Sequence, residues 1–386
     1  MARVEYRNGR WYDGRGFVAR TAWTDGPRFA AGPLPGAEMV DLDGAFVVPP
    51  YGDAHVHWLE PDLVDAYVAQ HVRAGVLYVK DHATSAAFRE AMRPALGPVE
   101  LVSAHRGFTA PDAHPAGLVD GLVGLGVLPP SWGPARGDGE LFHAVASEGD
   151  VDRAWPLLLA TRPDFVKVFL VRSATYGRPA ATRERGLDPA LVPGIVARAH
   201  DAGLRVAAHV EDAHDVRVAV AAGVDDLAHL PFALDGDPAA FAIEEADALA
   251  LGRRGGTVAT TLEWLDESPA GLAVTRDNVA RLRAAGVTLL VGSDVFRTTA
   301  VAEADRLVRH GLLAPAELLR AWCVDTPRAI TRRPGVGALV PGAEASFLAL
   351  RADPLADVAA TGDIALRVRD GEPVAPADVP MPALPV

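Results

Sequence analysis

The order of apolar and polar residues divides the chain into three parts. Up to about residue 48, short alternations are broken by glycine and proline, as in Val4-Glu5-Tyr6-Arg7 before Asn8-Gly9, which predicts short strands joined by turns. From about residue 50, short runs rich in Val, Leu and Ala alternate with helical stretches, the pattern of a parallel sheet. The strand-like alternation returns after about residue 336, as in Ser346-Phe347-Leu348-Ala349-Leu350.

The middle part contains eight candidate strands with helices between them. Three of the helical stretches end just before Gly203, Gly223 and Gly286, where a helix C-terminus favours glycine. Eight strand–helix units predict an α/β fold of the (β/α)₈ TIM-barrel type. The candidate strands are the run ending at residue 57 and residues 75–79, 99–104, 164–170, 204–209, 224–229, 257–261 and 287–294.

These patterns predict two domains. Residues 50–335 form the barrel, and residues 1–49 and 336–386 together form a small β-sandwich domain. The connection from about 105 to 163 is long and rich in Gly and Pro, so we expect it to carry extra helices or a function. The Pro-rich tail from Pro373 is expected to be loosely held.

Composition narrows the class of protein. A formal charge of −13 argues against a nucleic-acid surface, and 49% hydrophobic residues suffice for a large core. Cys323 is the only cysteine, and neither a signal peptide nor a membrane span is visible. We expect a cytoplasmic enzyme with a small-molecule substrate and no nucleic-acid or membrane partner; a homo-oligomer is left open.

A pair of histidines, His55 and His57, follows the first apolar run of the middle part. Residues i and i+2 of a strand point to the same side, so both imidazoles would enter one space. Neutral imidazole is a common metal ligand. A coincidental pair of partly buried histidines is the alternative.

Polar residues at other strand ends join this pair. A barrel builds its active site at the C-terminal ends of its strands, and a chain that needs only a core would not place polar groups there. Lys167 is notable because it and Lys80 are the only lysines, and a buried ammonium is costly. A neutral lysine amine can react with carbon dioxide to form an anionic carbamate. The strand-end residues are His55, His57, Lys167, His209, His229 and Asp294.

This set resembles the amidohydrolase superfamily of metal-dependent hydrolases. Pro49-Pro50-Tyr51-Gly52-Asp53-Ala54-His55-Val56-His57 is similar to its first-strand signature, and residues 337–348 to its small flanking β domain. The likeness is greatest to the binuclear branch with a carboxylated lysine, including prolidase-like members and isoaspartyl dipeptidases. It implies that His55 and His57 bind the more buried metal, that Lys167 bridges, that His209 and His229 bind the other metal, and that Asp294 binds metal and transfers protons.

The resemblance implies hydrolysis of a C–N bond in an amide, dipeptide or cyclic amide by a metal-bridging hydroxide, with Asp294 as proton shuttle. Two divalent cations can polarise a carbonyl and acidify water. Zinc is the expected cation, although these ligands also accept manganese, cobalt and iron. Two alternatives are an ester or lactone hydrolase with the same site and a non-catalytic barrel that binds a ligand; the complete ligand set argues against the second.

Substrate-binding candidates follow the third, fourth and eighth strands. His114 could hold the substrate carbonyl, and the arginines suggest a substrate carboxylate. Exposed loop or surface side chains are the alternative for each. His82 and His105 could also line the pocket. The candidates are His114, Arg172, Tyr176, Arg178 and Arg297.

Overall fold

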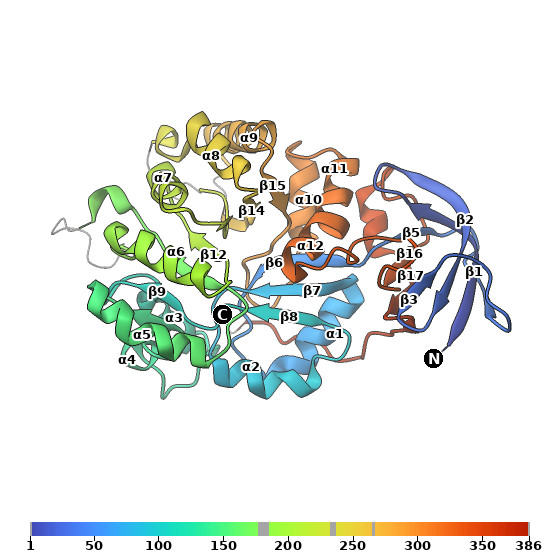
Figure 1. The fold of residues 1–386 in the computed structure, drawn as a ribbon, viewed down its shortest axis with the longest axis horizontal. Helices are drawn as coiled ribbons and strands as arrows, with labels where there is room; N and C mark the ends of the chain where they lie inside the picture. Colours follow the sequence, from blue (N-terminus) through green and yellow to red (C-terminus); the bar gives the residue numbers. More distant parts are fainter. Residues whose placement is uncertain (1, 177–184, 232–236, 265–266, 385–386) are drawn as a thin grey trace.

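The computed structural model describes residues 2–176, 185–231, 237–264 and 267–384. These residues form two sheets of parallel strands, which helices surround, and one mixed sheet at the far end of the molecule (Figure 1). No helix in these four ranges is long and apolar enough to cross a bilayer.

The mixed sheet joins the two ends of the chain. Its order is β18-β17-β16-β5-β1-β2-β3, with β4 beside β1, and β16 pairs antiparallel with β5 through Leu348 and Val48. The terminal segments therefore share one sheet, as predicted, while their description as a sandwich stays a prediction. The strands are β1 (Arg3–Tyr12), β2 (Phe17–Asp25), β3 (Arg28–Ala30), β4 (Glu38–Asp41), β5 (Phe46–Val48), β16 (Phe347–Leu350), β17 (Ile364–Arg369) and β18 (Glu372–Pro373).

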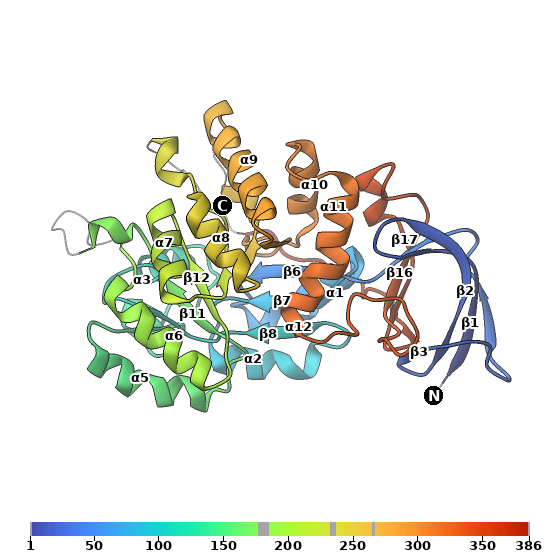
Figure 2. The same cartoon turned by 45° about the horizontal axis from the view of Figure 1, so that its top comes forward.

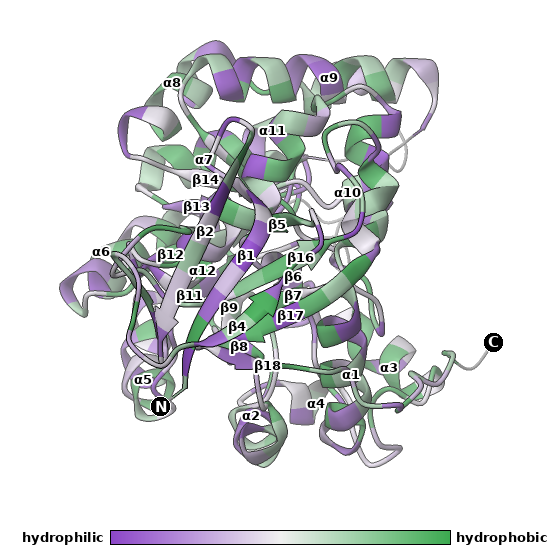
Figure 3. Cartoon of the chain, turned by 90° about the vertical axis from the view of Figure 1, so that its right-hand side faces the viewer, coloured by the Kyte–Doolittle hydropathy of each residue, from purple (hydrophilic) through white to green (hydrophobic). Residues whose placement is uncertain are grey.

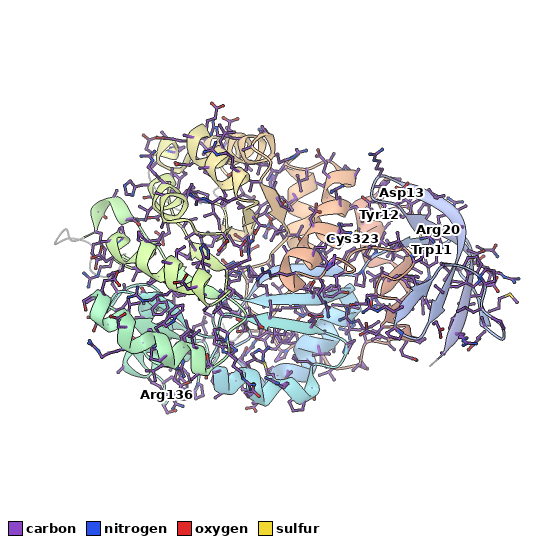
Figure 4. The ribbon with its side chains drawn as sticks, viewed as in Figure 1. Trp11, Tyr12, Asp13, Arg20, Arg136 and Cys323 are labelled. Carbon is purple, nitrogen blue, oxygen red and sulfur yellow. The ribbon has the colours of Figure 1, made fainter. Side chains whose placement is uncertain are left out.

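Aromatic side chains fill the inner face of this sheet. Phe347 packs edge-on against Tyr6 and lies close to Trp11, with ring centroids 4.9 and 5.3 Å apart. The Arg20 guanidinium lies 4.9 Å from the Trp11 ring, and Figure 4 places both residues on this sheet. Aromatic packing of this kind stabilises a sheet beyond the area it buries.

The parallel strands account for all eight predicted strands. A three-stranded sheet contains β6 (Tyr51–Val56), β7 (Val76–Asp81) and β8 (Glu100–Ser103). A seven-stranded sheet has the order β10-β9-β11-β12-β13-β14-β15, and two of its strands, β9 and β10, come from the long connection and were not predicted as strands. Its members are β9 (Gly107–Thr109), β10 (Phe142–Ala144), β11 (Val166–Phe169), β12 (Val206–His209), β13 (Asp226–Leu227), β14 (Thr257–Ala259) and β15 (Thr288–Leu290).

Backbone hydrogen bonds connect the two parallel sheets at both edges. Ala54 N donates to Val291 O and Asp294 N to His55 O, each at 2.8 Å, which ties β6 to the segment after β15. At the other edge, Asp164 N donates to Ser103 O at 2.9 Å. A Cβ on Gly292 would lie 3.0 Å from His55 N, so glycine permits the close approach that sets His55 and Asp294 side by side.

Helices cover the outside of the parallel strands (Figure 2). The glycines predicted to follow helix C-termini have the expected backbone conformation, since Gly203, Gly223 and Gly286 all have positive φ. The long connection carries α3, α4 and α5, as expected. The helices are α1 (Val64–Ala74), α2 (Ala86–Met92), α3 (Ala116–Gly124), α4 (Pro134–Gly137), α5 (Glu148–Ala160), α6 (Val192–Asp201), α7 (Ala213–Ala222), α8 (Glu245–Arg253), α9 (Pro269–Ala284), α10 (Val301–Arg309), α11 (Pro315–Arg320) and α12 (Thr326–Thr331), with the π-helix Ala321–Asp325 between the last two.

A buried polar group connects the mixed sheet to the parallel strands. Glu344 Oε1 accepts hydrogen bonds from Tyr78 OH of β7 at 2.6 Å, from Arg369 of β17 at 2.5 Å and from Ser346 Oγ at 2.7 Å. Burial opposes ionisation, but Arg369 and these hydrogen bonds lower the pKa of Glu344 below its usual value. The carboxylate therefore stays charged and paired, and fixes the mixed sheet against β7.

The C-terminal tail is held more firmly than its composition suggested. Arg73 of α1 donates to Ala377 O at 3.1 Å, and Arg297 donates to Pro382 O at 3.2 Å and to Ala383 O at 2.7 Å. Figure 3 shows the tail running past α1 toward α3. The expectation of a loosely held tail is wrong for residues 377–383, because arginines distant in sequence satisfy its carbonyl groups.

Candidate metal centre

Three predicted ligands converge at the end of β6. His55 Nε2 and His57 Nε2 lie 3.2 Å apart, and Asp294 Oδ1 lies 3.3 Å from the first and 3.1 Å from the second. The three donor atoms all lie within 4.8 Å of one another. Two imidazole nitrogens and a carboxylate oxygen facing one point form a donor set that suits a divalent cation.

The tautomer of His55 favours such a role. Its Nδ1 lies 2.7 Å from Ala228 O, and a carbonyl can only accept, so Nδ1 carries the proton and Nε2 presents a lone pair. Burial lowers the pKa of His55 well below its usual value, which keeps the ring neutral. For Asp294, burial opposes ionisation, but the hydrogen bond to His57 and nearby positive groups lower its pKa overall.

Lys167 lies inside this group of side chains. It is 1% exposed on β11, and burial lowers its pKa to about 7, so a large fraction of the amine is neutral near neutral pH. Its Nζ lies 3.2 Å from His82 Nδ1, while His82 Nε2 lies 3.0 Å from Ala54 O. The carbonyl requires the proton on Nε2, so Nδ1 accepts a hydrogen bond from Lys167.

Gly107 on β9 provides the space for the Lys167 side chain. A Cβ at this position would lie 2.4 Å from the Phe169 ring and 3.1 Å from Lys167 Cγ. Both residues point to the same side of β11, because they are two apart in a strand. Glycine is therefore required sterically beside these two side chains.

His209 and His229 form a second pair. His229 Nε2 lies 2.7 Å from His209 Nδ1, and His229 Nδ1 lies 3.1 Å from Leu230 O. Burial lowers the pKa of both rings well below the usual histidine value. The His55 and His229 rings are stacked with centroids 5.9 Å apart, so the second pair adjoins the first.

A cavity of about 340 Å³ opens onto these groups. Its described lining contains five of the six predicted ligands, all except His229, together with His114 and Glu211. The other lining residues are apolar: Leu59, Ala83, Pro115, Leu118, Val119, Leu122, Leu141, Phe169 and Phe296.

The predicted substrate-binding residues have different surroundings. His114 lines the cavity and stacks on His209 with ring centroids 4.4 Å apart, and burial lowers its pKa to about 4. The Arg172 side chain is 43% exposed, with Nε 3.6 Å from Glu211 Oε2. Tyr176 is partly buried at the edge of the described region, and Arg178 lies outside the described residues.

Arg297 has partners other than a substrate. Its guanidinium forms a buried ion pair with Glu60 at 2.5 Å and binds the two tail carbonyls. It is absent from the described residues that line the cavity, as are Arg172 and Tyr176. We therefore do not retain these three residues as an anion site.

The sequence did not single out some of the residues that line or adjoin the cavity. Phe169, Glu211 and Phe296 each lie two residues after a predicted ligand. In a continuing strand, residues i and i+2 point to the same side, so this spacing could have indicated that they line the cavity. His82 was only one of several candidate lining residues, and the structure places it against Lys167. The α3 residues had no sequence signal, because their position depends on how the long connection folds back.

A family model described as "Amidohydrolase family" matches residues 46–374. No curated protein matches the sequence.

Solved structures resemble the whole chain. A crystal structure of an amidohydrolase is 18% identical, with a TM-score of 0.75, and the match covers 98% of this chain and 100% of that one. A prolidase complexed with N-methylphosphonate-L-proline is 19% identical, with a TM-score of 0.73 and coverage of 97% and 100%. Ochratoxinase of A. niger is 16% identical, with a TM-score of 0.74 and coverage of 96% and 95%. At these identities the similarity establishes a shared fold.

Proposed function

Because this chain belongs to the amidohydrolase family, it is a hydrolytic enzyme acting on C–N bonds, and we propose that it cleaves an amide, dipeptide or cyclic amide at a binuclear metal centre. The observation that carries the proposal is the convergence of the His55, His57 and Asp294 donor atoms beside buried Lys167. A structural role would not require three mutually facing donors in the lining of a cavity.

We assign the ligands as follows. His55, His57 and Asp294 would hold one cation, His209 and His229 would hold the second, and carboxylated Lys167 would be shared between them. Zinc suits this mixture of nitrogen and oxygen donors. When bound, the two cations supply Lewis-acid polarisation of the substrate carbonyl and lower the pKa of water.

The surroundings of Lys167 support its carboxylation. A neutral amine can attack the carbon of carbon dioxide, forming an N–C bond and releasing one proton, and the low pKa of Lys167 makes that neutral form available. The carbamate nitrogen keeps one hydrogen. His82 Nδ1, which lies 3.2 Å from Lys167 Nζ, can accept a hydrogen bond from this N–H and so orient the carbamate.

The protein side chains supply the proton transfers. Asp294 accepts a proton from the attacking water and returns it to the leaving nitrogen, which must be protonated before the C–N bond breaks. His114 is neutral near pH 7 and lines the cavity, so an N–H of its ring can hold the substrate carbonyl oxygen.

The fold that we propose to support this site is a closed (β/α)₈ barrel of residues 50–335, with a small domain of residues 1–49 and 336–386. The hydrogen bonds between β6 and the segment after β15, and between β8 and the segment just before β11, support closure. The ligands then lie at the C-terminal strand ends of one ring, where barrel enzymes build their sites.

We expect zinc-reconstituted protein to hydrolyse members of a panel of N-acyl amino acids, dipeptides, cyclic imides and neutral amides. Chelation should lower kcat/KM by at least about 100-fold, and added zinc should restore it, because water activation depends on the cations. Lactones and esters belong in the same panel. Turnover of these alone would favour the ester or lactone hydrolase, and amide hydrolysis that survives chelation would refute the metal-dependent mechanism.

A further inference from the structure

We infer that the substrate carries an uncharged apolar group, aryl or branched alkyl, on the acyl side of the scissile bond. This inference rests on the proposed function and specifies the substrate class of the same site. It replaces the substrate carboxylate that the arginines had suggested.

One face of α3 contributes apolar side chains to the cavity lining. Leu118 and Leu122 are four residues apart and therefore neighbours on this helix, and Val119 lies between them on the same side. All three line the same cavity as the histidines and Lys167, and Leu59 adds a further apolar side chain. Val119 and Leu122 are buried, whereas Leu118 is 49% exposed at the rim.

Apolar surface also begins directly beside the ligands. Phe296 follows Asp294 by two residues, and its ring centroid lies 5.9 Å from that of His57. Phe169 follows Lys167 by two residues, and its ring centroid lies 5.6 Å from that of His114. A substrate whose carbonyl reaches the ligands must place its adjacent group against these rings.

The charges near the cavity disfavour a substrate carboxylate. Outside the proposed ligands and His114, the charged side chain among the described lining residues is Glu211, an acid. Arg297 is bound to Glu60 and the tail, and Arg172 lies beside Glu211. The described part of the lining contains no arginine that could pair with a substrate anion, so burying that anion would cost its hydration, whereas an aryl group gains from burial.

Paired substrates test the inference. We expect zinc-loaded enzyme to hydrolyse the amide of 4-phenylbutyric acid with a kcat/KM at least about 100-fold above that of its 4-carboxybutyric analogue, a difference within reach of hydrophobic pockets. The corresponding hydroxamates, titrated by calorimetry, give the same comparison for binding without chemistry.

A substitution at the rim supplies the matched variant. Leu118→Arg should lower kcat/KM for the phenyl substrate about tenfold and raise that for the carboxylate analogue about tenfold, as one charge-assisted hydrogen bond allows. Leu125→Arg is the control, because Leu125 ends the same helix, is 39% exposed and does not line the cavity. It should change neither value.

The outcomes are separable. A phenyl hydroxamate that binds more tightly, with Leu118→Arg weakening it, upholds the inference even if no amide is cleaved, and in that case the hydrolase proposal fails. The inference is overturned if the carboxylate compound is cleaved or bound at least as well as the phenyl compound. The hydrolase proposal still stands in that case, provided that amide cleavage depends on metal.

Discussion

Asp294→Asn should lower kcat by roughly 10²–10⁴-fold, the usual range for general acid–base catalysis. The Asp294 carboxylate lies 3.1 Å from His57 Nε2 and faces the cavity, so it can take a proton from water and return it to the leaving nitrogen. Asparagine has nearly the same shape but cannot accept and release a proton at that position. KM should change by only a few fold.

Asp294 is also a proposed ligand, so metal content must be measured for the same variant. The comparison is between preparations with equal zinc per chain. Asp305→Asn is the control, because this α10 carboxylate is 58% exposed and does not line the cavity. Wild-type kcat in fully metallated Asp294→Asn would mean that another group transfers the proton.

Lys167→Ala should lower kcat/KM by ~10³-fold or more, since loss of a shared ligand should exceed the 10–100-fold typical of residues that only orient ligands. Acetate or propionate should restore part of the activity, because a small carboxylate can occupy the space left by the carbamate. Intact-mass measurement after gentle desalting should show wild-type protein carrying one additional carbon dioxide.

Lys80→Ala provides a matched control for rescue, since it removes the chain's other lysine. Lys80 Nζ lies 3.1 Å from Asp226, and neither residue lines the cavity that holds the proposed ligands. Asp226 would keep its ion pair with Arg205, so the loss of Lys80 should lower the free energy of unfolding by only about 1–3 kcal/mol, without rescue by acids. Lys167→Ala with undiminished activity, or equal rescue of both variants, would contradict the bridging assignment.

The sequence was informative where local rules decide the structure. The i, i+2 spacing of His55 and His57 put both imidazoles on one side of β6, and the strand-end positions of Lys167, His209 and Asp294 brought them to one cavity. Glycine after a helix likewise predicted where α6, α7 and α9 end. These features depend on backbone geometry alone.

Long-range partners could not be read from the sequence. The position of Arg297 after Asp294 suggested a substrate ligand, yet a flexible guanidinium binds whichever acid the fold brings near, here Glu60. Lys80 has no partner that can be recognised in the sequence, and the fold buries it against Asp226. His71 is likewise buried in α1, with its ring hydrogen-bonded to Tyr67 O, because of packing that the sequence alone does not reveal.

The short strands β9 and β10 were missed for a related reason. Gly107-Phe108-Thr109 is too short to show an alternating pattern, and it forms a strand because Lys167 and Val168 of β11 pair with it. The same folding of the long connection places α3 over the cavity. The residues that select the substrate therefore became visible only in the structure.

The metal content of the purified protein tests the central claim most directly. Protein reconstituted with excess zinc, desalted and analysed by plasma mass spectrometry should contain about two zinc ions per chain, because five of the six proposed ligands line one cavity and the sixth, His229, contacts His209. Lys167→Ala should retain fewer under the same conditions. A stoichiometry that stays at one under saturating zinc would contradict the binuclear centre and leave Lys167 with a different role.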